Sequence, residues 1–128
     1  MKIIFGVSAS VAIYRACDLV RELTKAGHEV HVVMTRTAAS WINPVLFEAL
    51  SDNAVVADAT ASGMAHIEIR KGAQLMLVAP ASADLIARAA HGRGDDILTA
   101  TLLNRLTRER KTQPLRLFIV LINDQIIS

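Results

Sequence analysis

The sequence predicts a three-layer α/β domain, spanning residues 1–128, in which helices cover both faces of a parallel sheet. Three observations support this fold. Short apolar runs rich in β-branched residues alternate with segments of helical periodicity. Hydrophobic residues make up 52% of the chain and aromatic residues only 4%, which indicates a core of aliphatic side chains. Small and polar residues follow the apolar runs directly, as in flavodoxin-like or Rossmann-like sheets.

The first three elements form a βαβ unit. Ile3–Val7 is a short apolar run and predicts a buried strand. A helical stripe follows and ends at Gly27, the usual residue just beyond a helix, before the second strand at His28–Met34. Two strands joined by one helix are parallel, with a right-handed crossover. The stripe consists of Ala16, Leu19, Val20 and Leu23.

The remaining segments continue the alternation. Pro44 opens a short helix, and Asp95 and Asp96 cap a later one. The predicted elements are a helix at Val45–Leu50, a brief strand at Ala54–Ala57, a strand at Gln74–Pro80, a helix at about Leu85–Ala90, a helix after Asp96 and a strand within Leu115–Ile122.

Composition excludes several classes of function. A formal net charge of +2, with basic residues not interleaved with aromatic ones, argues against nucleic acid as a partner. His28 and His31 lack the spacing of a metal pair on one strand face, so we expect no metal site. The chain has a single cysteine, Cys17, which is consistent with a reducing compartment. We expect Cys17 to pack as a small buried hydrophobic residue. No apolar run has the length of a membrane span, and we expect a cytoplasmic protein with no membrane partner.

The loop between the first strand and the first helix is a candidate anion site. The first backbone N–H groups of a helix lack partners inside the helix, and the helix dipole places positive charge there. Gly6 and Ala9 allow close approach of the backbone, and the hydroxyls of Ser8 and Ser10 can donate hydrogen bonds or cap the helix. The glycine spacing of the dinucleotide fingerprint is absent, and a capped helix without a ligand is the alternative.

Two further loops are expected at the same edge of the sheet. Thr35 and Thr37 follow the second strand, where their hydroxyls can serve a phosphate or cap a helix. Ala81–Asp84 follows the Gln74–Pro80 strand and offers small residues against which a flat ring can lie. His66 is a candidate acid or base at a loop junction, with a purely structural histidine as the alternative.

Three motifs together resemble one known family. They are Gly6–Arg15, which is similar to G-x-S-G-S-I-A-A-Y-K, the histidine segment Ala65–Ile69, and Ala79–Asp84, which is similar to A-P-A-S-A-N and is followed by Gly94–Leu98. This combination resembles the flavin-dependent cysteine decarboxylases, the flavoprotein family that includes phosphopantothenoylcysteine decarboxylase. The resemblance covers residues 2–103, and the tail at 104–128 does not take part in it.

The resemblance implies FMN as the cofactor and a set of residues that bind it. By analogy the phosphate lies near Ala9, Ser10 and Val11, with help from Thr35 and Thr37. The isoalloxazine ring lies by Ser82, Ala83 and Asp84.

The resemblance also implies an activity. His66 matches the catalytic histidine of the family, and the reaction is decarboxylation of 4'-phosphopantothenoylcysteine to 4'-phosphopantetheine in coenzyme A biosynthesis. Members assemble as homotrimers or as dodecamers of trimers, with the flavin at a subunit boundary.

Departures from the family pattern leave other functions open. Ala9 replaces a glycine, and Asp84 replaces an asparagine and is expected to repel an anionic ligand. The substrate motif P-x-M-N-x-x-M-W is missing, with Asn123 as its one candidate survivor. A truncated, frame-shifted or degenerate copy is one interpretation. One alternative is a non-catalytic FMN-binding or regulatory protein. Another is a flavin prenyltransferase, although the His66–Ile69 segment argues against it.

Overall fold

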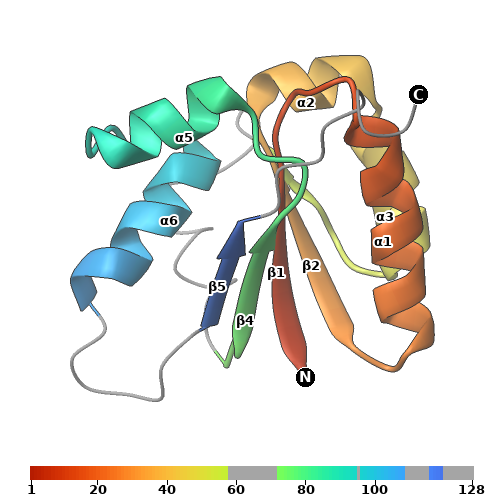
Figure 1. The fold of residues 1–128 in the computed structure, drawn as a ribbon. Coiled ribbons are helices and arrows are strands. Elements are labelled where there is room, and N and C mark those ends of the chain that lie inside the picture. The colour runs from red at the N-terminus through yellow and green to blue at the C-terminus, as the bar shows by residue number, and fades with distance from the viewer. Residues whose placement is uncertain (58–71, 95, 109–115, 120–128) are drawn as a thin grey trace.

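Five parallel strands form one sheet in the order β3-β2-β1-β4-β5. The structure is a computed structural model that describes residues 1–57, 72–94, 96–108 and 116–119 (Figure 1). Its elements are β1 (Lys2–Val7), α1 (Ile13–Lys25), β2 (Glu29–Met34), α2 (Arg36–Trp41), α3 (Pro44–Ser51), β3 (Val56–Ala57), β4 (Leu75–Val78), α5 (Ala83–Ala90), α6 (Ile97–Arg108) and β5 (Arg116–Ile119). The predicted parallel α/β fold is therefore confirmed.

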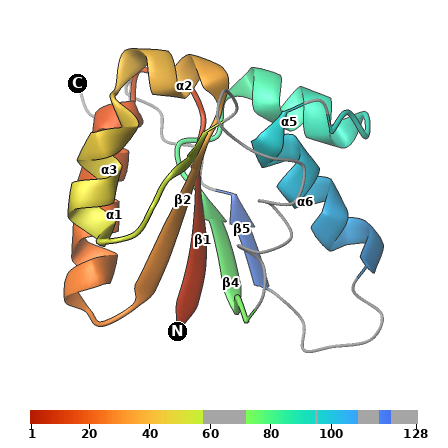
Figure 2. The same cartoon turned by 180° about the vertical axis from the view of Figure 1, so that it is seen from behind.

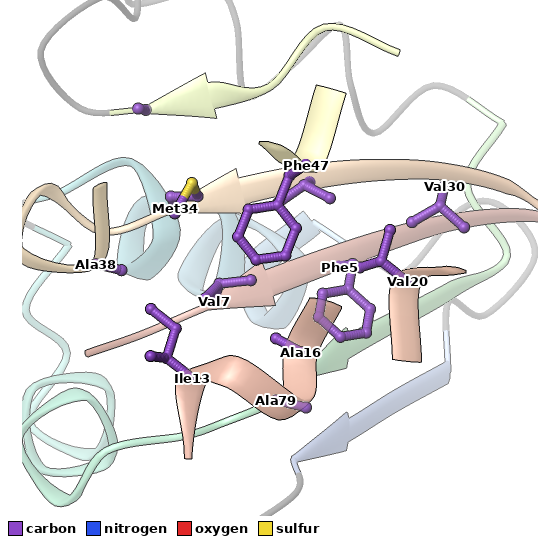
Figure 3. Packing of buried hydrophobic residues seen from close by; sticks show 12 residues of the cluster. Phe5, Val7, Ile13, Ala16, Val20, Val30, Met34, Ala38, Phe47 and Ala79 are labelled. Atoms are coloured by element: carbon purple, nitrogen blue, oxygen red, sulfur yellow. The ribbon is translucent and has the colours of Figure 1, made fainter. Parts of the chain in front are cut away.

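Helices cover both faces of the sheet. α1 and α3 lie on one face and α5 and α6 on the other, and the view from behind shows the same separation (Figures 1 and 2). Alternate residues of β1 enter the two cores, because successive side chains of a strand point to opposite faces. Phe5 and Val7 pack with Phe47 of α3 and Val20 of α1 (Figure 3), whereas Ile4 packs in the cluster of α5 and α6.

Gly6 has a packing role in β1. A Cβ atom at this position would lie 2.6 Å from Leu98 Cδ1 and 3.3 Å from Val78 Cγ2. Real Cβ atoms do not approach so closely, so the absence of a side chain lets α6 pack directly against the centre of the sheet. The close approach expected of Gly6 thus serves a neighbouring helix.

Side-chain caps explain where several helices begin. Thr35 Oγ1 accepts a hydrogen bond from Ala38 N–H at the start of α2, and Asn43 Oδ1 accepts one from Val45 N–H before Pro44 of α3. Ser82 caps α5, where its Oγ accepts from Leu85 N–H. α2 is not among the helices that the sequence predicts, because six residues are too few to show a helical period.

The other boundaries shift by a few residues. α5 begins at Ala83 rather than Leu85, β4 is shorter than Gln74–Pro80, and β5 lies inside Leu115–Ile122. Gly27 has a φ of +92°, as expected of a residue just beyond a helix. None of the described helices is long and apolar enough to cross a membrane.

Candidate functional site

A cavity of about 570 Å³ opens at the carboxyl ends of β1, β2 and β4. Ligands of open parallel sheets bind at this edge, and small-molecule sites commonly measure roughly 300–1,000 Å³. Of the residues predicted to bind a ligand, Ala9, Thr35, Thr37, Ser82 and Asp84 line it. Ser10 and Val11 continue the loop from Ala9, and Ala83 lies between two lining residues, but these three are not part of the wall.

The loop before α1 presents a row of unpaired backbone donors. Among the described residues, no acceptor pairs with the N–H groups of Ala9, Ser10 and Val11, which we call the amide row. Ser10 instead supplies acceptors, with its Oγ 3.3 Å from Ala12 N and its carbonyl oxygen 2.9 Å from Ile13 N. Three successive free N–H groups before a helix suit an anion such as phosphate.

Ser8 lines the cavity, but its hydroxyl is already hydrogen-bonded within the chain. It is 1% exposed, and its Oγ donates to Pro80 O at 2.6 Å and accepts from Ser82 N–H at 2.8 Å. The Ser8 hydroxyl, which the sequence suggested for a ligand or a helix cap, therefore connects the loop after β1 to the loop after β4. Ser8 donates a hydrogen bond, as the sequence predicted, but its partner lies beyond β4 and it does not cap α1.

The N-cap and first turn of α2, directly after β2, contribute one buried and two exposed side chains. Thr35 is buried, and its hydroxyl caps α2, as the second interpretation of this residue held. Thr37 and Arg36 are exposed and line the cavity, and Arg36 has no ion pair with another described residue. A hydroxyl and a guanidinium thus stand beside the amide row, and both can donate to an anion.

An ion cluster of Asp84, Arg88 and Asp96 forms the opposite wall. Arg88 Nε donates to Asp84 Oδ2 at 3.0 Å, and its Nη1 donates to Asp96 Oδ2 at 2.5 Å. The hydrogen bond to Asp96 raises the pKa of Arg88 further above its usual range. Arg88 therefore stays charged and links the last turn of α5, where it lies, to Asp96 at the N-terminal end of α6.

Asp96 is the least exposed member of this cluster, with a side chain that is 12% exposed. Its Oδ1 accepts from Thr99 N–H at 2.7 Å and from Thr99 Oγ1 at 2.6 Å, the geometry of a cap for α6. Burial by itself would raise the pKa of Asp96, but the hydrogen bonds from Thr99 and the charge of Arg88 outweigh it and lower the pKa below its usual value.

Asp84 is paired rather than isolated. The sequence raised the expectation that its carboxylate repels an anionic ligand, and the ion pair with Arg88 offsets that charge. The spacing of four residues on one helix was the available signal for this pair.

Five more wall residues were not predicted as ligand contacts: Arg36, Trp41, Arg88, Arg93 and Asp96. Arg36 stands between two predicted residues in the sequence, which was the one local hint of its position.

Other candidates fall outside the wall. His66 and Asn123 lie outside the described residues. Burial raises the pKa of the Cys17 thiol, as suits a packing residue rather than a nucleophile. Among the described residues, no group of His, Cys, Asp and Glu side chains has the arrangement of a metal site.

Comparison with known proteins assigns the chain to a family. The sequence profile named Flavoprotein matches residues 1–116. The coenzyme A biosynthesis bifunctional protein CoaBC of Mycobacterium tuberculosis is 48% identical over 104 residues, and that of Vibrio vulnificus is 44% identical over 106 residues. Each match covers 80% of this chain and 25–26% of the relative, so the chain spans about a quarter of the length of these proteins.

Solved structures agree with this assignment. The FMN-dependent cysteine decarboxylase SpaF superposes with a TM-score of 0.71 at 30% identity, over 80% of this chain and 62% of that one. The peptidyl-cysteine decarboxylase EpiD superposes with a TM-score of 0.75 at 25% identity, over 99% of this chain and 73% of that one. With its parallel sheet, its cavity at the carboxyl edge and a profile match over most of its length, the chain belongs to the Flavoprotein family.

Proposed function

We propose that this chain is an FMN-dependent carboxy-lyase domain that converts 4'-phosphopantothenoylcysteine to 4'-phosphopantetheine in coenzyme A biosynthesis. One observation carries the proposal: a single cavity joins Ala9, the first member of the amide row after β1, to Ser82 and Asp84 after β4. The 48% identity to CoaBC and the likeness to SpaF supply the reaction class.

The residues of the amide row fit the phosphate of FMN. A phosphate carries about two negative charges and three acceptor oxygens at neutral pH. Ala9, Ser10 and Val11 offer three N–H groups without other partners among the described residues, and Thr37 and Arg36 offer a hydroxyl and a positive charge. Ala9 has only a methyl group, which leaves the backbone accessible to the ligand.

The loop after β4 fits the ring. Ser82 and Asp84 line the cavity, with Ala83 between them at the start of α5, and the small side chains leave room for a flat group. When bound, FMN supplies the two-electron chemistry that decarboxylation at a cysteine requires. The chain's own contribution is to bind, orient and exclude water.

The substrate and the assembly belong to the same proposal. His66 holds or moves a proton beside the substrate, and Asn123 contacts it. The working unit is a cytoplasmic homo-oligomer, a trimer or a dodecamer of trimers, without membrane or nucleic-acid partners. The motif at Ala65–Ile69 supports the role of His66, and membership of the Flavoprotein family supports the assembly, whereas Asn123 lies beyond the matched residues 1–116.

A second candidate function is FMN binding without turnover. It is favoured by Asp84, which stands in place of the family's asparagine and whose carboxylate is engaged by Arg88 at 3.0 Å. An asparagine can donate and accept, whereas this carboxylate only accepts, so a substrate acceptor at this point would lose its partner.

Turnover distinguishes the two candidates. The purified chain is mixed with FMN and 4'-phosphopantothenoylcysteine, and release of CO2 and formation of 4'-phosphopantetheine are followed. We expect turnover in the wild type and, in His66→Asn, retained FMN with turnover reduced by about 10²-fold or more, the usual scale for losing an acid–base group. FMN binding without any CO2 release supports the second candidate, and full activity of His66→Asn removes His66 from the mechanism.

A further inference from the structure

Ser8 connects the loop after β1 to the loop after β4. It lies one residue beyond β1, is 1% exposed, and donates from its Oγ to Pro80 O at 2.6 Å. The same oxygen accepts from Ser82 N–H at 2.8 Å, and Ser8 N–H donates to Pro80 O at 3.3 Å. One small side chain thus binds the loop after β4 through two backbone groups.

The sheet alone does not make this connection. The ladder between β1 and β4 ends with Ala79 N–H, which donates to Gly6 O at 2.9 Å. Beyond that point one backbone hydrogen bond, from Ser8 N–H to Pro80 O, continues the link, and the Ser8 side chain adds the bonds to Pro80 O and Ser82 N–H. A hydroxyl can donate and accept at once, which the two bonds of Ser8 Oγ require.

The two loops are the two halves of the proposed cofactor site. Ala9, the first member of the amide row, follows Ser8 directly. Ser82, whose amide Ser8 binds, caps α5 and precedes Ala83 and Asp84. Ser8 therefore sits between the place proposed for the phosphate and the place proposed for the ring.

We infer that Ser8 is a positioning residue that sets the separation of the phosphate loop from the ring loop and so couples the two halves of FMN. This inference rests on the proposed function. A ligand that contacts two loops binds more tightly when the loops are already at the right spacing, because less ordering is left for the binding step. The connection gives no such advantage to a ligand that contacts one loop only.

Ser51 provides a matched control. Its hydroxyl is also buried, at 3% exposure, and also bridges two backbone groups, donating to Phe47 O at 2.7 Å and accepting from Asn53 N–H at 3.3 Å. It lies at the end of α3 and is not part of the cavity wall. Ser51→Ala therefore imposes a comparable loss of buried hydrogen bonds without touching the joint between the loops.

The test measures three dissociation constants for each variant. FMN, riboflavin and inorganic phosphate are titrated against the full chain as wild type, Ser8→Ala, Ser8→Thr and Ser51→Ala, by flavin fluorescence or calorimetry. The temperature lies where circular dichroism shows each variant folded. We expect Ser8→Ala to raise the Kd for FMN about 10-fold, because the loss of roughly one net hydrogen bond leaves the two loops less well ordered before binding. The Kd for riboflavin or for phosphate should rise less than about 3-fold. We expect Ser8→Thr to restore most of the FMN affinity and Ser51→Ala to leave it unchanged.

The outcomes separate the inference from the proposed function. If the wild type binds no FMN, the proposed function fails and the inference with it. If the wild type binds FMN and Ser8→Ala matches Ser51→Ala, only the inference is overturned. An equal loss for FMN, riboflavin and phosphate also overturns it, because the loops would then be damaged separately. Where Ser8→Ala does not fold, Ser8→Thr and Ser8→Cys are compared, and equal FMN affinity in both, despite the weaker hydrogen bonds of a thiol, contradicts the inference.

Discussion

The two walls of the cavity satisfy their polar groups in opposite ways. On the side of β1 and β2, the amide row and Arg36 have no partners among the described residues. On the side of α5 and α6, the charged groups are paired: Arg88 binds both Asp84 and Asp96. Asp96 also accepts a hydrogen bond from Thr99 N–H. The first wall offers unpaired donors to an anion, whereas in the second two carboxylates share one guanidinium and so link two helices.

This difference separates binding from stability. Groups that have no partner until a ligand binds contribute little to the free energy of unfolding of the ligand-free protein. Their loss should therefore lower the affinity for the ligand. Groups that are buried and paired should affect folding when one partner is removed, because the other is left uncompensated. The predictions below test that division, from the largest expected effect to the smallest.

Asp96→Ala should cause the largest loss of stability. It leaves the Arg88 guanidinium, which is 18% exposed, without its shorter ion pair and removes the cap of α6. We expect the free energy of unfolding to fall by about 3 kcal/mol, measured by urea denaturation. The control is Asp18→Ala, which breaks the exposed Asp18–Arg21 pair and should change stability by less than about 0.5 kcal/mol. Equal losses in the two variants would refute the structural role of the cluster.

The contribution of Asp96 should also depend on pH. Its pKa is lowered in the folded state, so its stabilising effect is present above the unfolded value of about 3.9 and is lost as the pH falls through the folded value. Asp96→Asn should therefore be less stable than wild type at pH 7, and the gap should narrow below about pH 4. A gap that stays constant from pH 7 to pH 3 contradicts the assigned direction of the shift.

Arg36→Met should affect binding alone. The side chain is exposed and has no ion pair with another described residue, so stability should stay within about 0.5 kcal/mol of wild type. Loss of its charge beside the amide row should raise the Kd for FMN about 10-fold at low salt. Riboflavin, which lacks the phosphate, should bind unchanged, and Arg21→Met on the outer face of α1 is the control. An equal loss for riboflavin would mean that Arg36 does not contact the phosphate.

Asp84→Asn should have the smallest effect. The Asp84 side chain is 77% exposed, and an exposed i,i+4 pair is worth less than about 0.5 kcal/mol. Because Arg88 offsets its charge, removing the carboxylate should change the Kd for FMN by less than about 2-fold, measured by fluorescence titration. A clear gain in FMN affinity would show that Asp84 repels the ligand in spite of Arg88.

Much of the fold could be predicted from local pattern, and the site only in part. Hydrophobic periodicity located β1, α1 and β2, and the topology rules then placed Thr35 and Ser82 at one edge. The six residues of α2 were missed because they show no full period. The bonds of Ser8 to Pro80 and Ser82 join segments that lie far apart in the chain, and no local pattern carries that information.

Titration of the purified chain with FMN tests the central claim most directly. Quenching of flavin fluorescence should saturate at one FMN per chain with a Kd on the order of micromolar, and riboflavin should bind more weakly because it lacks the group that the amide row receives. A folded chain that leaves FMN fluorescence unchanged at about 100 µM protein, or that binds riboflavin as tightly as FMN, would contradict the account.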